Sequence, residues 1–259
     1  MRNARRTSAT DPRPLRAFGV DIGGSGIKGA IVDLRSGALL TDRERVPTPS
    51  PSKPAAVASI VATLVADLGW RGKVGATFPA VIESGVAKSA ANVDPSWIGT
   101  DVDAVFSTAT GRAVTVLNDA DAAGLAEVRY GAAKDVDGVV IMLTFGTGIG
   151  SAMFVDGQLI PNTELGHLEI DGKDAEKRAA ASVRERKDLK WREWAERVST
   201  YLQHVEALFS PGLFVIGGGV SRHSEKWLPY VDVQTPTTPA QLHNDAGIVG
   251  AALASRDRR

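Results

Sequence analysis

The sequence predicts an α/β fold made of two similar lobes, and three observations carry this prediction. Segments with strand and helix patterns alternate along the 259 residues, which is typical of this class. A strand, a glycine-dense turn and a returning strand occur over residues 17–34 and again over 138–155. When Gly23 is set on Gly146, Asp33 falls on Asp156, so the two hairpins have the same spacing. Equal hairpins with equal turns indicate a duplicated lobe.

The remaining elements of the first half follow from their hydrophobic patterns. A helix is expected over 55–68, where apolar residues recur at helical spacing without glycine or proline. Strands are expected over 74–78 and 113–117, and the second of them leads directly into an Asn-Asp pair. Residues 122–130 then favour a helix.

The second half adds one strand and two helices. Aromatic and aliphatic residues recur at steps of three and four over 187–209, which predicts a long amphipathic helix that carries two tryptophans. A buried strand over 213–216 opens into three successive glycines. The final helix is expected over 245–254, with Asn244 as its N-cap.

Charge and cysteine content exclude several classes of protein. The 30 lysines and arginines balance 30 aspartates and glutamates, so no overall field draws the chain to nucleic acid or to a membrane. The absence of cysteine excludes disulfides and thiolate-bound zinc and favours a reducing, cytoplasmic location. Because no run of about 18 apolar residues exists, we expect no membrane span. Residues 1–15 lack the apolar core of a secretion signal, and we expect a disordered tail there.

The first glycine-dense turn has the composition of a phosphate-binding loop. It follows a carboxylate at a strand end, and its glycines let backbone N–H groups approach an anion closely. The acid could hold Mg²⁺ directly or through water, and a lysine in the returning strand could add positive charge. Donor contacts are therefore expected from Asp21, Gly23, Gly24, Ser25, Gly26 and Lys28. A tight hairpin whose glycines only permit positive φ is the alternative.

A second turn of the same kind favours the phosphate interpretation. One such hairpin from each lobe could hold a phosphoryl donor from both sides of a cleft, with threonine hydroxyls as donors to the anion. The expected contacts are Thr144, Gly146, Thr147 and Gly148. Neither turn fits the Gly-x4-Gly-Lys-Ser/Thr pattern, which disfavours a P-loop fold.

Asn118 and Asp119 lie between the two turns, at the end of a strand and before a helix. An aspartate in this position can sit at the bottom of a cleft and accept the proton of an attacking hydroxyl. Phosphoryl transfer depends mostly on positioning and charge stabilisation, so a carboxylate of ordinary basicity suffices. A simple helix N-cap is the alternative, because Asn-Asp is common before helices.

Glu164 and His167 place a carboxylate and an imidazole three residues apart. Together they could bind neighbouring hydroxyls of one small polyol, which needs paired acceptors and donors. A structural or surface histidine is the alternative. A metal role for His167 lacks partners at ligand spacing, because His204, His223 and His243 are scattered along the chain.

The two turns, the Asn-Asp pair and the Glu-x-Gly-His motif together resemble the ROK family of sugar kinases, whose members carry them in this order. The resemblance covers roughly residues 18–254. It implies a two-lobed, actin-like ATPase fold with RNase H-like lobes around a central cleft. It also implies that the chain transfers a phosphoryl group to the 6-hydroxyl of glucose, with Mg²⁺ as cofactor, and that it forms a homodimer.

The same resemblance implies particular roles for residues. Asp119 would be the catalytic base, and glucose would be bound by Asn118, Glu164, His167, Glu176 and Asn92. Many relatives bind zinc through this histidine and three cysteines, and this chain has no cysteine. We therefore expect no zinc site here, and packing from the tryptophan-bearing helix in its place.

The expected phosphoryl donors are inorganic polyphosphate and ATP. Nine lysines and arginines lie within residues 173–197, and a polyanion would bind a positive track of this kind. A solvated helix face is the alternative, because acidic residues are interleaved with them. Gly217, Gly218 and Gly219 resemble the adenosine-side turn of actin-like ATPases, which implies that ATP is accepted, although a plain strand-to-helix turn would look the same.

These inferences divide the chain into a tail (1–15), an N-terminal lobe (16–118), a C-terminal lobe (119–239) and a final segment (240–259) whose helix returns to the first lobe. Three alternatives stay open: an ATP-dependent kinase of another hexose or amino sugar, a repressor of the same family, and a filament-forming ATPase. A repressor needs a helix-turn-helix domain before the first turn, where only the tail is expected. The Glu-x-Gly-His motif favours a sugar substrate over a filament.

Overall fold

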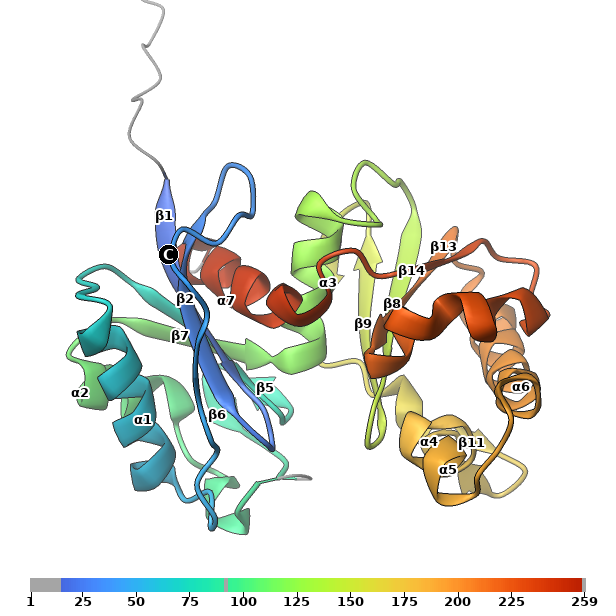
Figure 1. The fold of residues 1–259 in the computed structure, drawn as a ribbon, viewed down its shortest axis with the longest axis horizontal. Coiled ribbons are helices and arrows are strands. Elements are labelled where there is room, and N and C mark those ends of the chain that lie inside the picture. Colours follow the sequence, from blue (N-terminus) through green and yellow to red (C-terminus); the bar gives the residue numbers. More distant parts are fainter. Residues whose placement is uncertain (1–14, 91–92, 258–259) are drawn as a thin grey trace, which may run out of the picture.

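Two five-stranded sheets form the framework of the molecule (Figure 1), a computed structural model that describes residues 15–90 and 93–257. The first sheet contains β1 (Arg16–Ile22), β2 (Ile27–Asp33), β3 (Glu44–Val46), β4 (Val74–Phe78) and β7 (Val114–Asn118). The second contains β8 (Val139–Phe145), β9 (Ile149–Val155), β10 (Gln158–Ile160), β13 (Leu213–Gly218) and β14 (Thr237–Pro239).

The two sheets repeat one topology. Their strand orders are β3-β2-β1-β4-β7 and β10-β9-β8-β13-β14. In each sheet the first three strands form an antiparallel meander, and two further strands add in parallel beside the first. The predicted α/β fold with a duplicated lobe is confirmed by this match, strand for strand. The lobe boundaries at 118/119 and 239/240 stay a prediction.

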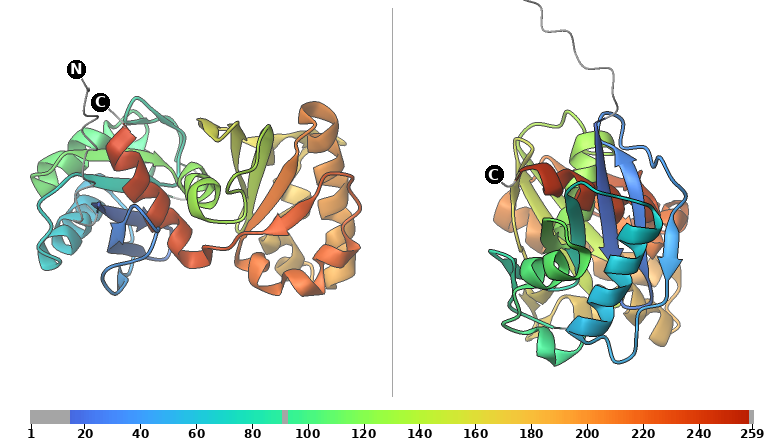
Figure 2. Two further views of the ribbon diagram at one scale, coloured as in Figure 1. Left: turned by 90° about the horizontal axis from the view of Figure 1, so that it is seen from above. Right: turned by 90° about the vertical axis from the view of Figure 1, so that its left-hand side faces the viewer.

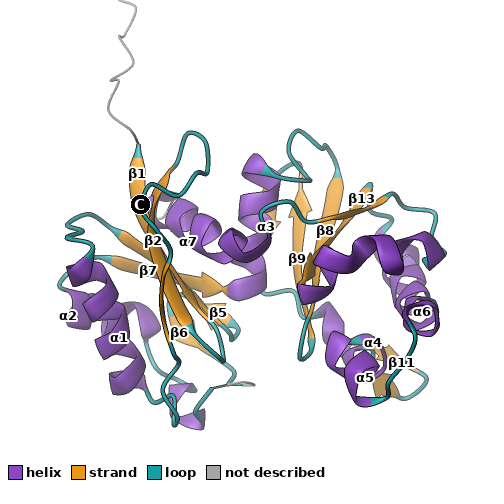
Figure 3. Ribbon diagram, in the orientation of Figure 1, coloured by secondary structure: helices purple, strands orange, loops and turns teal. Residues whose placement is uncertain are grey.

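Helices α1 (Pro54–Asp67) and α2 (Val102–Thr110) cover the outer face of the first sheet, as Figure 3 shows. Their apolar residues, among them Val61 and Phe106, pack against Phe78 of β4. The fully buried Trp97 fills the space between them, with its ring centroid 4.5 Å from that of Phe78. The expected helix over 55–68 is therefore present, whereas α2 had not been predicted.

Helix α7 (Ala246–Asp257) packs on the opposite face of the first sheet, and α3 (Asp119–Tyr130) packs against α7 between the two sheets (Figure 2). Three glycines allow this close approach. A Cβ at Gly19 or Gly75 would collide with a carbonyl oxygen of α7, and a Cβ at Gly250 would collide with one of α3. The two helices thus couple the sheets through backbone contacts that only glycine permits.

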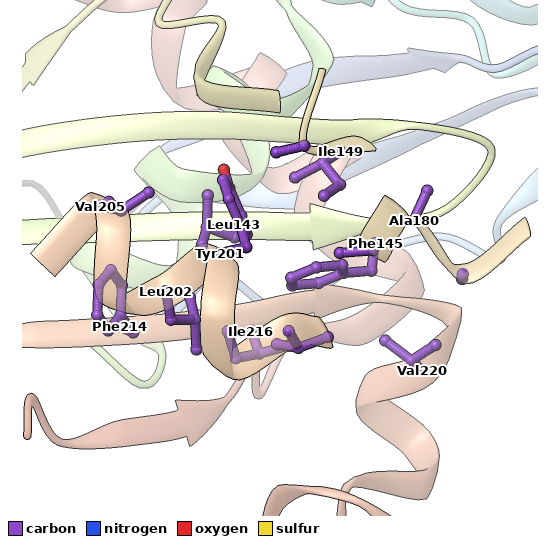
Figure 4. Packing of buried hydrophobic residues seen from close by; sticks show 14 of the residues in the cluster. Leu143, Phe145, Ile149, Ala180, Tyr201, Leu202, Val205, Phe214, Ile216 and Val220 are labelled. Carbon is purple, nitrogen blue, oxygen red and sulfur yellow. The ribbon is translucent and has the colours of Figure 1, made fainter. Parts of the chain in front are cut away.

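The second sheet is covered by α6 (Trp191–Phe209) and by two shorter helices, α4 (Glu176–Ala179) and α5 (Ala181–Arg186). Figure 4 shows Tyr201 and Leu202 of α6 packed over Phe145 and Phe214 of the sheet, all of them buried. Two small hairpins complete the chain: β5 (Ile82–Glu83) with β6 (Val86–Ala87), and β11 (Glu169–Ile170) with β12 (Lys173–Asp174).

Three helix starts differ from the prediction. Helix α3 begins at Asp119, three residues before the expected start at 122. The long helix begins at Trp191 rather than at 187, because Asp188 adopts a positive φ of 49° and separates α5 from α6. The final helix begins at Ala246, after a 3₁₀ turn over His243–Asp245. Asn244 lies inside that turn, so its prediction as the N-cap was wrong.

Among the residues described, no helix has the length and apolar character that crossing a bilayer requires. The predicted tail, apart from Leu15, and the predicted sugar ligand Asn92 lie outside the described residues.

Candidate active site

A cleft of about 210 Å³ opens between the two sheets. We call it the central cleft. Six of the predicted site residues line it, namely Asp21, Lys28, Asp119, Thr144, Gly217 and Gly218. Its remaining wall includes Ser221 and the segment that leads into α7. The cleft therefore brings together predicted donor-binding residues from both sheets and the predicted base.

Asp21 is held in the central cleft by two hydrogen bonds. Lys28 is its cross-strand partner, and the Lys28 Nζ donates to Asp21 Oδ2 at 2.9 Å. Thr77 of β4 donates from Oγ1 to Asp21 Oδ1 at 3.0 Å and accepts the Ile22 N–H at 2.9 Å. Thr77 was missed in the sequence, although a polar side chain in an otherwise apolar strand was the available signal.

The first turn is closed by the Gly23 N–H, which donates to the Gly26 carbonyl at 3.1 Å. Gly24 and Ser25 are exposed at its tip. The guanidinium of Arg45 lies across the turn, where Nη2 donates to the Ser25 carbonyl at 3.0 Å and leaves no room for a Cβ at Gly26. Arg45 thus brings a positive charge to this turn that the sequence analysis did not anticipate.

None of the glycines that the structure describes in the two turns has a positive φ. The alternative interpretation, in which these glycines serve only to permit left-handed backbone, is therefore not supported. Gly24 and Gly146 carry no side chain, and open space lies beside their backbone. This space suits close approach of an anion.

The second turn is tied to the short helix α5. The Gly146 N–H donates to the Gly148 carbonyl at 3.0 Å, matching the closure of the first turn. Ser182 binds the turn twice: its N–H donates to the Gly146 carbonyl at 3.0 Å and its Oγ to the Thr147 carbonyl at 2.6 Å. Thr147 and Gly146 are exposed at the rim and do not line the central cleft.

The glycines after β13 lie beside the strand that enters the second turn. Gly217 is the register partner of Thr144, and Gly218 that of Phe145. Gly218 has a φ of 81°, and a Cβ there would collide with the Phe145 backbone, so this position requires glycine. Gly219 begins a 3₁₀ helix, η3 (Gly219–Lys226), and is not part of the cleft lining.

Asn118 caps the helix that carries Asp119. Its Oδ1 accepts the N–H groups of Ala120 and Asp121 at 2.8 and 3.2 Å, and its Nδ2 donates to the Ala80 carbonyl at 3.1 Å. The N-cap interpretation of Asn118 is therefore correct. The second Nδ2 proton stays available for a ligand, so a sugar contact by Asn118 remains a proposal.

Asp119 is the first residue of α3, and its carboxylate is open to the central cleft. The enclosing walls of the cleft, together with the charges of Asp21 and Glu164, raise the pKa of Asp119 to about 6. Both neighbours are acids, so the site concentrates negative charge where a proton or a cation would be attracted. A carboxylate with a pKa close to neutrality is well matched to general base catalysis.

The Glu-x-Gly-His motif forms a second polar group near Asp119. His167 Nε2 lies 3.9 Å from Glu164 Oε2, and His167 Nδ1 lies 3.6 Å from Asp174 Oδ2. Burial and the charge of Glu176 raise the pKa of Glu164, while His167 opposes that shift. The imidazole is more than half exposed, so the pair can present polar atoms to a ligand.

Glu176 joins the second turn to this polar group. Its Oε2 accepts the Ile149 N–H at 3.2 Å and leaves no room for a Cβ at Gly148. One ligand atom each from His167, Asp174 and Glu176 lie within 4.8 Å of one another. Lys177 Nζ lies 2.8 Å from Asp174 Oδ2 and forms an ion pair with it.

Asp121 and Asn162 form a polar bridge that the sequence analysis missed. The Asn162 N–H donates to Asp121 Oδ2 at 2.9 Å, and the Asn162 side chain pairs with the backbone of Ile82. Asp121 is 1% exposed and its Oδ1 has no hydrogen-bond partner. Burial, with the charges of Asp119 and Glu164, raises the pKa of Asp121 to about 7.

The tryptophans of α6 brace the segment after the histidine motif. Trp194 is fully buried, and its Nε1 donates to the Ala179 carbonyl at 2.9 Å. Its ring lies 4.7 Å from that of Trp227 and 5.7 Å from that of Phe145. These contacts pack α6 against the segment that contains α4.

The cations of residues 173–197 are only partly free. Lys177 pairs with Asp174, Arg178 with Asp171 and Arg192 with Glu196. The guanidinium carbon of Arg184 lies 3.6 Å from the centroid of the Trp191 ring. Four of the nine cations thus have partners, three of them within the same stretch, and the alternative of an ordinary helical surface gains weight.

Two sheets of one topology, joined through α3 and α7 around a polar cleft, define the actin-like ATPase fold. Within that class the chain belongs to the ROK family, because residues 17–185 match it.

Individual relatives are similar over almost the whole chain. The polyphosphate glucokinase of Mycobacterium tuberculosis (strain CDC 1551 / Oshkosh) is 55% identical over 239 residues, which cover 92% of this chain and 90% of that protein. The polyphosphate glucokinase of Mycobacterium leprae (strain TN) is 53% identical over 241 residues, covering 93% and 74%. The crystal structure of an inorganic polyphosphate/ATP-glucomannokinase from Arthrobacter sp. strain KM superposes with a TM-score of 0.88 at 55% identity, covering 93% and 98%.

Proposed function

We propose that this chain transfers the terminal phosphoryl group of inorganic polyphosphate, and also of ATP, to the 6-hydroxyl of glucose. The product is glucose 6-phosphate. The observation that carries the proposal is the placement of Asp119, whose carboxylate faces the same cleft as Asp21, Thr144 and Gly217. The names of the polyphosphate glucokinases and of the glucomannokinase that resemble the chain support the choice of sugar and donors.

Asp119 acts as the base of the reaction. It accepts the proton of the glucose 6-hydroxyl while that oxygen bonds to the terminal phosphorus of the donor. The bond between this phosphorus and the bridging oxygen breaks, and the shortened donor leaves with the electron pair. Because its pKa is about 6, Asp119 is mostly ionised at neutral pH and keeps appreciable basicity.

The sugar is held beside Asp119 by the polar group of the histidine motif. Glu164 and His167 present an acceptor and an imidazole to neighbouring hydroxyls, and Glu176 completes the set. Asn118 contributes the remaining proton of its amide. These contacts fix the 6-hydroxyl against the base, and such positioning supplies a large part of phosphoryl transfer catalysis.

The donor is held by the two turns. Backbone N–H groups at Gly24, Ser25 and Thr147 are exposed at the rim, and Thr144 adds a hydroxyl inside the cleft. Arg45 and Lys28 bring positive charge to the first turn and to the cleft. For ATP, the nucleoside would lie toward the Gly217–Gly219 turn, of which Gly217 and Gly218 line the cleft.

We propose Mg²⁺ as the divalent cation of this reaction. The residues present fit this ion, because the two carboxylates of Asp21 and Asp119 face one small polar cleft. The charge of Asp21 also contributes to the raised pKa of Asp119. Asp21 would hold the ion directly or through water. When bound, the cation would neutralise charge on the phosphoryl oxygens.

A coupled assay tests the proposed function. Formation of glucose 6-phosphate is measured with polyphosphate and with ATP, each donor alone, and with Mg²⁺ removed by a chelator as a further arm. Product from polyphosphate supports the proposal, and absence of product from both donors would refute it. Mannose belongs in the same assay, because one relative is named a glucomannokinase. The homodimer and the cytoplasmic location stay predictions.

A further inference from the structure

A second cavity adjoins the central cleft. It has a volume of about 460 Å³ and lies between the loop that follows β2 and the segment that leads into α7. Its wall contains Arg43, Arg222, His243, Asn244 and Asp245, together with residues 37–39. We call it the outer groove. His243 and Asn244 line both the central cleft and the outer groove, so the two spaces share a wall.

The outer groove carries cations from both halves of the chain. Arg43 comes from the loop between β2 and β3, and Arg222 comes from η3 in the second half. Both side chains are exposed, and His243 belongs to the same wall. Asp245 is the acid in this wall, and its Oδ1 accepts from Arg43 Nη1 at 2.8 Å.

That ion pair orients Arg43 and leaves most of its N–H donors available. Arg43 Nη1 makes one contact with Asp245, and the guanidinium carries five N–H donors. Within residues 15–90 and 93–257, no acid forms an ion pair with Arg222. Two guanidinium groups are therefore available in one groove, and guanidinium is the group best suited to bidentate contact with phosphate.

The small volume of the central cleft means that a long donor must extend beyond it, toward a second site such as the outer groove. At about 210 Å³ the cleft is smaller than the roughly 300–1,000 Å³ of ordinary ligand pockets. A long polyphosphate chain with its terminal phosphate at Asp119 must leave the cleft, and next to the wall that His243 and Asn244 form lies the outer groove with its two arginines. A triphosphate has no phosphates to place that far out.

We propose that the outer groove binds the distal phosphates of long inorganic polyphosphate through Arg43 and Arg222. The proposal rests on the proposed function and assigns the extra length of the donor to a site of its own. It replaces the stretch 173–197 as the main contact surface for polyphosphate, because four of the nine cations in that stretch have partners nearby.

The test compares donors of different length in the same variants. Initial rates are measured with long-chain polyphosphate, tripolyphosphate and ATP for Arg222→Ala, Arg43→Ala and the double variant. Loss of one charge-assisted contact is expected to lower kcat/KM for the long chain about tenfold or more. Rates with tripolyphosphate and ATP should stay within about twofold of wild type. Arg222→Lys should recover part of the loss because it keeps the charge.

Two further arms keep the outcomes distinct. Arg71→Ala removes an exposed arginine that lines neither cavity and should leave all three donors unchanged. Binding of long-chain polyphosphate is also measured by calorimetric titration without glucose, so the groove is judged even if no donor is turned over. Weaker binding of long-chain polyphosphate by the double variant is by itself enough to support the groove. Equal losses for all three donors, or unaltered binding of the long chain, would overturn it.

Discussion

The side-chain amide of Asn162 and the backbone of Ile82 are paired in both directions. Asn162 Oδ1 accepts the Ile82 N–H at 2.9 Å, and Asn162 Nδ2 donates to the Ile82 carbonyl at 2.9 Å. Asn162 lies two residues before Glu164, and its own N–H is bound by Asp121, two residues after Asp119. The bridge therefore ties the loop that carries the proposed sugar ligands both to the first half of the chain and to the helix that carries the proposed base.

Asn162→Ala should weaken glucose binding selectively. Loss of two hydrogen bonds frees the loop that carries Glu164 and His167, so we expect KM for glucose to rise about tenfold while KM for the donor stays within about twofold. Steady-state kinetics with each substrate varied in turn measures this. Gln158→Ala, an exposed change on the neighbouring strand β10, is the control. An equal rise in both KM values would show that the bridge does not act on the sugar loop.

Asp121→Asn should stabilise the protein relative to wild type at alkaline pH but not at acidic pH. The folded state raises the pKa of Asp121 to about 7, above its ordinary 3.8, so folding favours the protonated form. The stability that protonation contributes is complete below about pH 4 and is lost as the pH rises through 7. Asparagine keeps the acceptor for the Asn162 N–H and carries no charge. We expect a gain of at least ~1 kcal/mol at pH 8, or roughly 2–4 °C in Tm, and little change at pH 4.

Thermal melts of both proteins across this pH range, followed by circular dichroism, measure the effect. Asp121→Ala is the matched comparison, because it removes the acceptor together with the charge and should lose stability at both pH values. A Tm difference between Asp121→Asn and wild type that does not vary with pH would contradict the account.

The rate with polyphosphate should rise with pH through about 6 and then level off. The raised pKa of Asp119 means that the base is ionised above this pH and protonated below it. Below pH 6, kcat/KM for glucose should fall about tenfold for each further pH unit. A profile of kcat/KM between pH 4.5 and 8.5 records this dependence. A flat profile down to pH 5 would mean that Asp119 titrates as an ordinary carboxylate.

Trp194→Ala should destabilise the protein by roughly 3–5 kcal/mol, the usual cost of removing a large buried aromatic side chain. Trp194→Phe keeps most of the packing and loses only the hydrogen bond to the Ala179 carbonyl, so its cost should be about 1 kcal/mol. Denaturant unfolding measures both.

Treatment of the wild type with a zinc chelator should leave Tm unchanged, and a chelator-induced loss would reveal a structural metal after all.

The sequence was sufficient to predict the hairpins and the repeat, because both depend on local features. Strand β13, for example, begins with the continuous apolar run 213–216, and the two glycine-dense turns differ sharply from their surroundings. The order of the two sheets then follows from the repeat. Helix α2 and the break at Asp188 were missed, since the first is short and the second depends on one residue with positive φ.

The candidate site was predicted in its principal residues but not in its supporting ones. Asp21, Asp119 and Thr144 could be chosen because each stands at a strand end or a helix start. Thr77, Arg45 and Asn162 act on residues from 20 to 80 positions away, and no local pattern reveals a partner at that distance. For Asn118 the sequence could not decide whether the residue contacts the sugar as proposed. It also forms the N-cap of α3, and the cap alone explains an asparagine at this position.

The most direct test of the central claim is the turnover of Asp119→Asn. The amide keeps the size of the side chain but cannot accept the proton of the glucose 6-hydroxyl, so kcat should fall by roughly 10² to 10⁴. Glucose binding, followed by equilibrium titration, should stay measurable, and Glu83→Gln, which changes an exposed acid that does not line the central cleft, should behave as wild type. If Asp119→Asn retained near-normal turnover, Asp119 could not be the base and the mechanism would be contradicted.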